Sequence, residues 1–466
     1  MIIILLFAKL VIYYYIMKNS NEKIDLLSPG KRKAQLKSLD EAARLVLTGI
    51  FGENRMSDRV LAAYFREKRC CGSRDRALIS ETIYSTLRYW GFLRKYLPAE
   101  RCADLESGKV RFSQNQLGAL LCASAFIAGN MESAAVLQEN LLLPRLPAAA
   151  GSPVRRARQL LDYFGVPHVA ISERDMVPQW ILSALPPEME EAPFLEALML
   201  RPPMWIRFQC LNDEEKSAAL KELSDNGAEV TLHETMPDAA MVRAKINLCT
   251  LEAYRSGKFE IQDLGSQCVG AVCAPRSGER WLDACAGAGG KSLQLASLMK
   301  RKGCVTAGDL RTYKLEELRK RARRAGFPNI MTKDNSALLR RPKHPYDGVR
   351  VDAPCSCAGV WRRNPGSQWQ LKESEVAALA AEQLQILQDY AAAVRPGGVL
   401  VYATCSLFDQ ENSGVVRQFL AENRESFKLD PFTHPLTGDV MPGMVRIDGY
   451  KFDCDTLFAA RLRKVK

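Results

Sequence analysis

Histidine is scarce in this chain, and its four copies among 466 residues do not stand at a spacing that fits a shared metal ion. They are His168, His233, His344 and His434. The 14 cysteines include Cys70-Cys71 and Cys355-x-Cys357 but no C-x-x-C, which argues against a zinc site. So few histidines also argue against a hydrolase that pairs a Ser or Cys nucleophile with a His base. We therefore predict that the chain holds no metal.

A secretory framework is also missing. No charged segment precedes the apolar start MIIILLFAKLVIYYYIM, and no small-residue cleavage site follows it. Cysteines without such a framework are typical of free thiols in a reducing compartment, so we expect a cytoplasmic protein. Lys9 makes a membrane span by residues 1–17 costly, by roughly 2.5–3.5 kcal/mol. We interpret 1–17 as a start-site artefact ahead of Met17 or, as the less favoured alternative, a membrane anchor.

Acidic residues are outnumbered by basic ones, since 53 Asp and Glu stand against 65 Lys and Arg, for a formal charge of +12. Such an excess suits a polyanionic partner such as RNA, although many basic proteins bind no nucleic acid. The hydrophobic content of 47% and the charged content of 25% are ordinary for a globular protein. The length leaves room for two to four domains.

Hydrophobic periodicity divides the chain into three folded blocks. From 36 to 165, apolar residues recur at helical spacing, as Ile79, Ile83 and Leu87 do, which predicts an all-helical domain. Residues 168–275 predict a small α/β module in which a helix capped by Asn212 lies between two strands. Residues 276–466 alternate strands with helices, which is typical of a doubly wound, mostly parallel sheet. The predicted fold class is therefore α/β.

The chemically distinctive side chains of the third block stand where predicted strands end. Five such strands close on, or are followed directly by, Asp283, Asp309, Asp334, Asp352 and Cys405. Ligands of open α/β sheets bind outside the carboxyl ends of the strands. We therefore expect these residues to line one crevice.

The turn that follows the first of these strands, Cys285 to Lys291, suits an adenosyl cofactor. Its glycines allow the backbone to approach a ligand closely, and Asp309 can accept hydrogen bonds from a ribose. Asp334 stands where it can accept a hydrogen bond from an adenine amino group. The turn does not fit G-x-G-x-x-G, which argues against a dinucleotide. S-adenosylmethionine, which has no pyrophosphate, fits this turn better.

Two thiols near adjacent strand ends, Cys355 and Cys405, fit a specific chemistry. Methylation of an unactivated aromatic carbon, such as C5 of a pyrimidine, requires a nucleophile to add first at C6, and a thiolate suits that task. Asp352 is placed to stabilise the adduct at the N3/N4 edge of the base. The alternative is that both cysteines are small buried hydrophobic residues, as free cysteines usually are. Their convergence on one crevice favours the chemical role.

Three motifs, DACAGAGGK, DAPCSCAGVWRRNP and YATCSLFDQEN, closely resemble those of the Sun-type RNA cytosine-C5 methyltransferases. The resemblance is strong from Phe259 to Asn412 and implies that residues 276–466 form a Rossmann-like, S-adenosylmethionine-dependent methyltransferase domain. It is weaker across 168–275, which look like that family's RNA-recognition-like subdomain. The helical block is similar to the NusB-like domain of the family's bacterial small-subunit ribosomal RNA methyltransferases. This resemblance implies a monomer that acts on RNA, with ribosomal RNA favoured over transfer RNA.

The family's residue roles carry over to the matching positions. Cys405 in T-C-S is implied as the nucleophile, Cys355 in P-C as the thiol that assists product release, and Lys291 as a residue near the reacting centre. The implied contacts to S-adenosylmethionine come from Cys285, Ala286, Gly287, Ala288, Gly289, Gly290, Lys291, Asp309, Asp334 and Asp352. One departure is Ala288, where the family usually has Pro, and this change should loosen the turn while leaving its length intact.

Arg362 and Arg363 follow the P-C motif, and we predict that they contact RNA phosphates. Three rival functions stay open. One is a non-catalytic RNA-binding ribosome assembly factor, and another is the same chemistry on transfer RNA. The third is a methyltransferase acting on nitrogen or on protein, which would need no cysteine.

Overall fold

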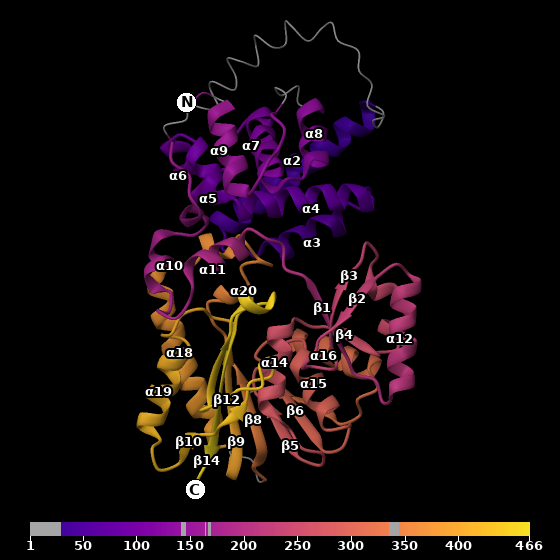
Figure 1. Ribbon diagram of the computed structural model, residues 1–466, viewed down its shortest axis with the longest axis vertical. Coiled ribbons are helices and arrows are strands. Elements are labelled where there is room, and N and C mark those ends of the chain that lie inside the picture. Colours follow the sequence, from indigo (N-terminus) through magenta and orange to yellow (C-terminus); the bar gives the residue numbers. More distant parts are fainter. Residues whose placement is uncertain (1–28, 141–145, 164, 166–168, 335–343) are drawn as a thin grey trace, which may run out of the picture. The chain divides into compact units, whose positions relative to one another are not determined.

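The computed structural model describes residues 29–140, 146–163, 165, 169–334 and 344–466 (Figure 1). The apolar residues 1–17 lie outside these ranges. The chain forms two compact units, one reaching to Arg201 and including Trp361–Leu371, the other comprising Pro202–Val360 and Lys372–Lys466. Within the described ranges, no helix is both long enough and apolar enough to span a membrane.

The first unit is helical, as predicted. Its helices are α2 (Pro29–Phe51), α3 (Ser57–Glu67), α4 (Ser73–Arg88), α5 (Trp90–Leu93), α6 (Ala99–Glu106), α7 (Gln114–Ala128), α8 (Met131–Asn140), α9 (Pro153–Tyr163), α10 (Gln179–Ala184) and α11 (Glu191–Leu198). The apolar stripe of α4, formed by Ile79, Ile83 and Leu87, is buried. Each of these side chains contributes about 1.5–3 kcal/mol by leaving water. The helical periodicity therefore identified a true core face.

The segment Trp361–Leu371 packs with the helices of the first unit although both its neighbours in sequence belong to the second. Three consecutive side chains, those of Gln368, Trp369 and Gln370, donate to backbone carbonyl oxygens of this unit at 3.0, 3.2 and 2.9 Å. The Trp361 side chain is buried. We refer to Trp361–Leu371 as the excursion.

The second unit begins with a four-stranded antiparallel sheet in the order β2-β3-β1-β4. Its elements are β1 (Met204–Phe208), α12 (Asp213–Asp225), β2 (Glu229–Leu232), β3 (Ala239–Arg243), α13 (Glu252–Arg255) and β4 (Phe259–Ile261). The side chain of Asn212 caps α12 by accepting from the backbone N–H of Glu215 at 2.9 Å. The predicted strand–helix–strand order is confirmed.

An eight-stranded sheet forms the rest of the second unit, and seven of its strands lie in the order β10-β14-β9-β8-β5-β6-β7, with β13 paired to β14. Its strands are β5 (Arg280–Asp283), β6 (Cys304–Gly308), β7 (Ile330–Lys333), β8 (Tyr346–Asp352), β9 (Val394–Thr404), β10 (Phe427–Leu429), β13 (Met444–Ile447) and β14 (Leu457–Lys464). The neighbours from β7 to β9 are parallel, as predicted. The antiparallel edge made by β14, β10 and β13 was not predicted.

Helices cover both faces of this sheet (Figure 1). Apolar residues of α14 (Leu264–Cys273), α15 (Gly290–Leu298) and α16 (Thr312–Arg324) share a core with one face. Those of α18 (Glu373–Ala391) and α19 (Ser413–Glu422) share a core with the other. The remaining short elements are β11 (Phe432–Thr433), β12 (Val440–Met441) and α20 (Gly449–Phe452).

The order of the parallel strands has a reversal between β5 and β8. The chain runs outward from β5 through β6 to β7, then returns to place β8 on the other side of β5. Ligands of such sheets bind at this switch point, beyond the carboxyl ends of the strands. The loops after β5 and β8 are therefore the two that should flank a ligand.

Candidate active site

The loop between β5 and α15 is tightly held without a proline. The N–H of Ala286 donates to the carbonyl oxygen of Gly308 at 2.7 Å, and Arg321 donates to the carbonyl oxygen of Ala288 at 2.9 Å. Gly289 has φ +87°, and a Cβ there would come within 2.4 Å of Leu318. Only glycine fits that position. The expected loosening by Ala288 is offset by these contacts.

Asp309, directly after β6, is buried, and both of its carboxylate oxygens accept hydrogen bonds from neighbouring residues. One carboxylate oxygen accepts from the N–H of Gly287 at 2.8 Å and from Nη2 of Arg311 at 3.2 Å. The other accepts from the N–H and Nε of Arg311 at 2.8 and 3.0 Å. Burial alone would raise the pKa of Asp309, but these bonds outweigh it and the pKa is lowered. The carboxylate therefore stays ionised at neutral pH.

Asp352 and Lys291 join the loops after β8 and β5. Lys291 Nζ lies 2.7 Å from a carboxylate oxygen of Asp352, and both side chains are largely buried. Burial alone would raise the pKa of Asp352, but the charges of Lys291 and Arg350 lower it. The pair places an ionised carboxylate and an ammonium group at the switch point.

Asp283, the first predicted strand-end residue, has a structural role. It is fully buried, stands opposite Arg350 across the β5–β8 pairing, and forms an ion pair with it. Ser292 of α15 donates to its second carboxylate oxygen. These contacts fix the ends of β5 and β8 relative to each other, and they occupy the carboxylate with protein groups rather than leaving it for a ligand.

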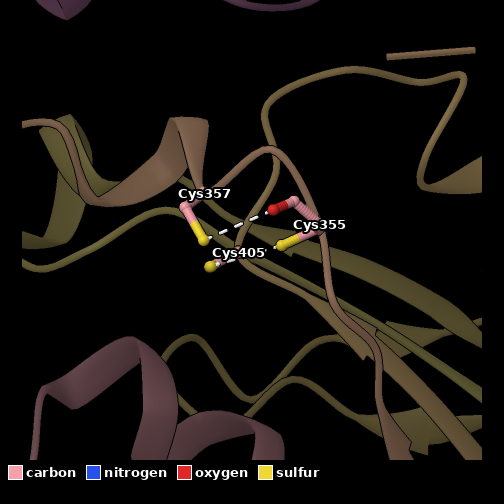
Figure 2. A group of neighbouring side chains, drawn as sticks. All are labelled: Cys355, Cys357 and Cys405. Carbon is pink, nitrogen blue, oxygen red and sulfur yellow. Dashed lines mark hydrogen bonds between the residues drawn. The ribbon is translucent and has the colours of Figure 1, made fainter. Parts of the chain in front are cut away.

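Three cysteines meet beyond the ends of β8 and β9 (Figure 2). The sulfur atoms of Cys355 and Cys405 are 3.4 Å apart, and the thiol of Cys357 donates to the carbonyl oxygen of Cys355 at 3.4 Å. All three sulfurs lie within 4.8 Å of one another. The sequence brought Cys355 and Cys405 together correctly but assigned no role to Cys357. The spacing Cys355-x-Cys357 was its only signal.

The thiols of this three-thiol cluster differ in pKa because they hydrogen-bond to one another. The pKa of Cys405 is well above the usual range of a thiol because of its hydrogen bonds with Cys355 and Cys357 and its burial. Hydrogen bonds from Cys355 and Cys405 lower the pKa of Cys357 instead. The resting thiol of Cys405 is therefore protonated. Cys405 must lose that proton before it can act as a nucleophile.

Glu411 connects the two loops that carry the thiols. Its fully buried carboxylate accepts from the N–H of Ser356 at 2.8 Å, from Nε2 of Gln383 at 2.8 Å and from the hydroxyl of Ser406. Ser356 neighbours Cys355 in sequence and Ser406 neighbours Cys405. The 3.4 Å separation of the two sulfurs is therefore set by one carboxylate. The sequence analysis passed over Glu411.

Comparison with known proteins decides the family. A family model described as 16S rRNA methyltransferase RsmB/F matches residues 271–463. A ribosomal RNA small subunit methyltransferase B from Vibrio vulnificus is 29% identical over 398 residues, which cover 81% of this chain and 90% of the relative. Residues 271–463 therefore belong to the RsmB/F family. The cofactor of these methyltransferases is S-adenosylmethionine.

A second relative and two solved structures are also similar to this chain. A probable ribosomal RNA small subunit methyltransferase B from Bacillus subtilis is 33% identical over 260 residues, covering 54% of this chain and 57% of the relative. Among solved structures, that of PH0851 has a TM-score of 0.70 at 22% identity and covers 95% of this chain and all of its own. NSun6 from Pyrococcus horikoshii, solved with SFG, has a TM-score of 0.51 at 20% identity, covering 61% and 100%. These two structures support the fold.

One predicted RNA contact, that of Arg362, needs revision. The Arg362 side chain lies in the excursion and is buried, while its carbonyl oxygen accepts from Arg88 at 2.7 Å. A buried guanidinium cannot reach a phosphate on the surface, so that prediction was wrong for Arg362 and is kept for the half-buried Arg363. Asp334 follows β7 and is exposed, and residues 335–343 beyond it lie outside the described ranges.

Proposed function

We propose that this chain transfers the methyl group of S-adenosylmethionine to C5 of a cytosine in 16S ribosomal RNA, through a covalent bond between Cys405 and C6 of the base. The observation that carries the proposal is the pair of sulfurs, Cys355 and Cys405, 3.4 Å apart and next to the ionised Asp352. Methylation of nitrogen or oxygen would not use two thiols at the ends of adjacent strands.

The reaction proceeds by addition and elimination. The Cys405 thiol loses its proton to water, and the thiolate adds to C6 while the electrons of the C5=C6 bond make C5 nucleophilic. When bound, S-adenosylmethionine would supply an electrophilic methyl group to C5 and be left as S-adenosylhomocysteine. A base then removes the C5 proton, the C5=C6 bond re-forms, and the thiolate of Cys405 leaves. Cys355, 3.4 Å from that sulfur, is placed to supply the proton that keeps Cys405 from adding again.

Asp352 and Lys291 are the groups that orient the base in this scheme. Since the pKa of Asp352 is lowered, its carboxylate accepts a hydrogen bond from the exocyclic amino group of cytosine and does not donate a proton. Uracil presents a carbonyl oxygen at that position, so an ionised carboxylate rejects it. Lys291, whose Nζ lies 2.7 Å from the same carboxylate, keeps it ionised and fixes its orientation.

The cofactor's ribose fits Asp309 only after Arg311 moves. A carboxylate offers about four acceptor positions. Three hydrogen bonds to the Asp309 carboxylate come from Arg311. The Arg311 side chain is more than half exposed, so withdrawing its guanidinium costs little. The loop Cys285–Lys291 would then hold the rest of the cofactor over Gly287, where a Cβ would meet nothing within 4 Å.

Arg311→Ala is therefore expected to strengthen the binding of S-adenosylmethionine by roughly twofold to fivefold, because an exposed ion pair is worth at most about 1 kcal/mol. Isothermal titration calorimetry of wild type and variant measures this difference. The control is Arg319→Ala, on the exposed side of α16, where the side chain bonds Thr332 instead. Weaker binding by Arg311→Ala than by Arg319→Ala would mean that Arg311 itself contacts the cofactor.

The other parts of the chain are proposed to bind the RNA. We retain 36–165 as a NusB-like domain, 168–275 as an RNA-recognition-like subdomain and 276–466 as the methyltransferase domain. The helical unit and the antiparallel sheet described above support these assignments. The printed names of the relatives support the small ribosomal subunit as the source of the substrate.

The substrate is tested by incubating the protein with S-adenosylmethionine and either 16S ribosomal RNA or a transfer RNA pool. Bisulfite sequencing then identifies 5-methylcytosine at single-nucleotide resolution. We expect conversion-resistant cytosines in the ribosomal RNA. Modification confined to transfer RNA would overturn the proposed substrate while leaving the chemistry in place, and binding without any methyl transfer would favour an assembly factor.

A further inference from the structure

The three-thiol cluster contains one more thiol than methyl transfer requires. Two thiols suffice for addition and release, yet the third sulfur, that of Cys357, lies within 4.8 Å of both others (Figure 2). Among the described residues, no histidine or carboxylate joins the three sulfurs at that distance. The result is a group of donors made of sulfur alone.

The backbone at Cys357 is strained. Its φ is +56°, in the left-handed region that residues other than glycine rarely adopt. This conformation costs on the order of 1–3 kcal/mol. The thiol of Cys357 donates to the carbonyl oxygen of Cys355, so the side chain points back to the cluster. The third thiol is thus held beside the other two in a backbone conformation that costs free energy.

We propose that Cys355, Cys357 and Cys405 form a binding site for a soft metal ion, Zn²⁺ or Cu⁺, held by three thiolates. Soft sulfur ligands select these ions over Mg²⁺ or Ca²⁺, which require oxygen. A metal–sulfur bond of about 2.3 Å sets the sulfurs of a trigonal or tetrahedral site about 3.8–4.0 Å apart. The separations here, 3.4 Å for the nearest pair and at most 4.8 Å overall, bracket that range.

An ion in this site would have three protein ligands and one open position. The two thiols proposed to react with RNA are both ligands, so the bound ion would block addition of Cys405 to the base. The site is therefore inhibitory, and its occupancy makes methylation sensitive to the availability of thiophilic metal. The prediction of no metal from the spacing of cysteines did not consider this cluster, because its sulfurs come from the ends of two strands, 50 residues apart.

Metal binding is measured on the reduced full-length chain without RNA or cofactor, so the result does not depend on the proposed methyl transfer. Titrations with Zn²⁺ and, without oxygen, with Cu⁺ use a competing chromophoric chelator. Co²⁺, a coloured substitute for Zn²⁺, reports sulfur ligation through its charge-transfer absorption. We expect one ion per chain, and a Co²⁺ band of the strength of three thiolates.

Cys357→Gly is the decisive variant because glycine suits the left-handed backbone and lacks only the thiol. Its affinity should fall by about tenfold or more, since losing even a second-shell partner costs 10–100-fold. Cys249→Ala, which removes an exposed cysteine outside the cluster, should bind like wild type. Undiminished binding by Cys357→Gly, or loss in Cys249→Ala alone, would overturn the proposal. Binding of Cu⁺ without Zn²⁺ would restrict it to the monovalent ion.

Discussion

Cys405→Ala is expected to lower methyl transfer by about 10⁴-fold or more, because it removes the proposed nucleophile. No covalent complex with RNA should form in this variant. Cys355→Ala should behave differently. Its Cys405 thiolate still adds to the base, but release is slow, so a covalent protein–RNA adduct should accumulate. The separation of 3.4 Å between the two sulfurs is what makes one thiol able to affect the release of the other.

Denaturing gel electrophoresis of protein mixed with 16S ribosomal RNA and S-adenosylmethionine distinguishes these outcomes. The matched control is Cys304→Ala, at the start of β6 and therefore at the opposite end of the strands, which should be as active as wild type. If the adduct accumulated in Cys405→Ala and vanished in Cys355→Ala, the two roles would be exchanged. If no variant formed an adduct on RNA shown to bind, the thiols would be structural.

Glu411→Ala is expected to lower both stability and rate. Its removal leaves the donors of Ser356, Gln383 and Ser406 without their acceptor, at about 1–3 kcal/mol for each group that finds no substitute. The free energy of unfolding should therefore fall by about 3 kcal/mol or more. The loops bearing Cys355 and Cys405 would separate, and a displacement of about 1 Å at a reacting group costs roughly 10²-fold in rate.

Chemical denaturation measures the first effect, and kcat measured well below the unfolding transition measures the second. KM for S-adenosylmethionine should stay unchanged, since Glu411 bonds none of the residues proposed to hold the cofactor. Glu411→Gln, which retains one acceptor oxygen, should lie between alanine and wild type. Glu425→Ala, at an exposed position, should change stability by no more than about 0.5 kcal/mol. A loss of stability in Glu411→Ala with unchanged kcat would limit Glu411 to a structural role.

Much of the crevice was predictable because its residues sit at strand ends, and strand ends can be found from periodicity. Asp309, Asp352 and Cys405 needed only the alternation of strands and helices and the rule that parallel strands point their carboxyl ends one way. The strand β14 was missed because its sequence, LFAARLRK, has no alternation of apolar and polar residues, and seven of its eight residues would suit a helix as well.

Other features depend on contacts that local sequence does not encode. Arg362 was expected to contact an RNA phosphate because it follows the P-C motif, but a hydrogen bond between its carbonyl oxygen and Arg88, 274 positions earlier, shows that its segment packs against a distant part of the sequence. Cys357 was passed over because its part in the cluster depends on a left-handed φ, which nothing in C-S-C-A-G demands. Glu411 was passed over because a buried carboxylate looks, in sequence, like any surface glutamate.

The excursion also limits how this protein can be divided. A fragment starting at Pro202 would contain every thiol of the crevice, yet it would carry Trp361 and Gln368 without the helices that bury them. The excursion, which begins four residues after Cys357, would then be a solvent-exposed, partly apolar loop. We therefore expect truncation or domain exchange at residue 201 to yield a less stable protein than the full chain.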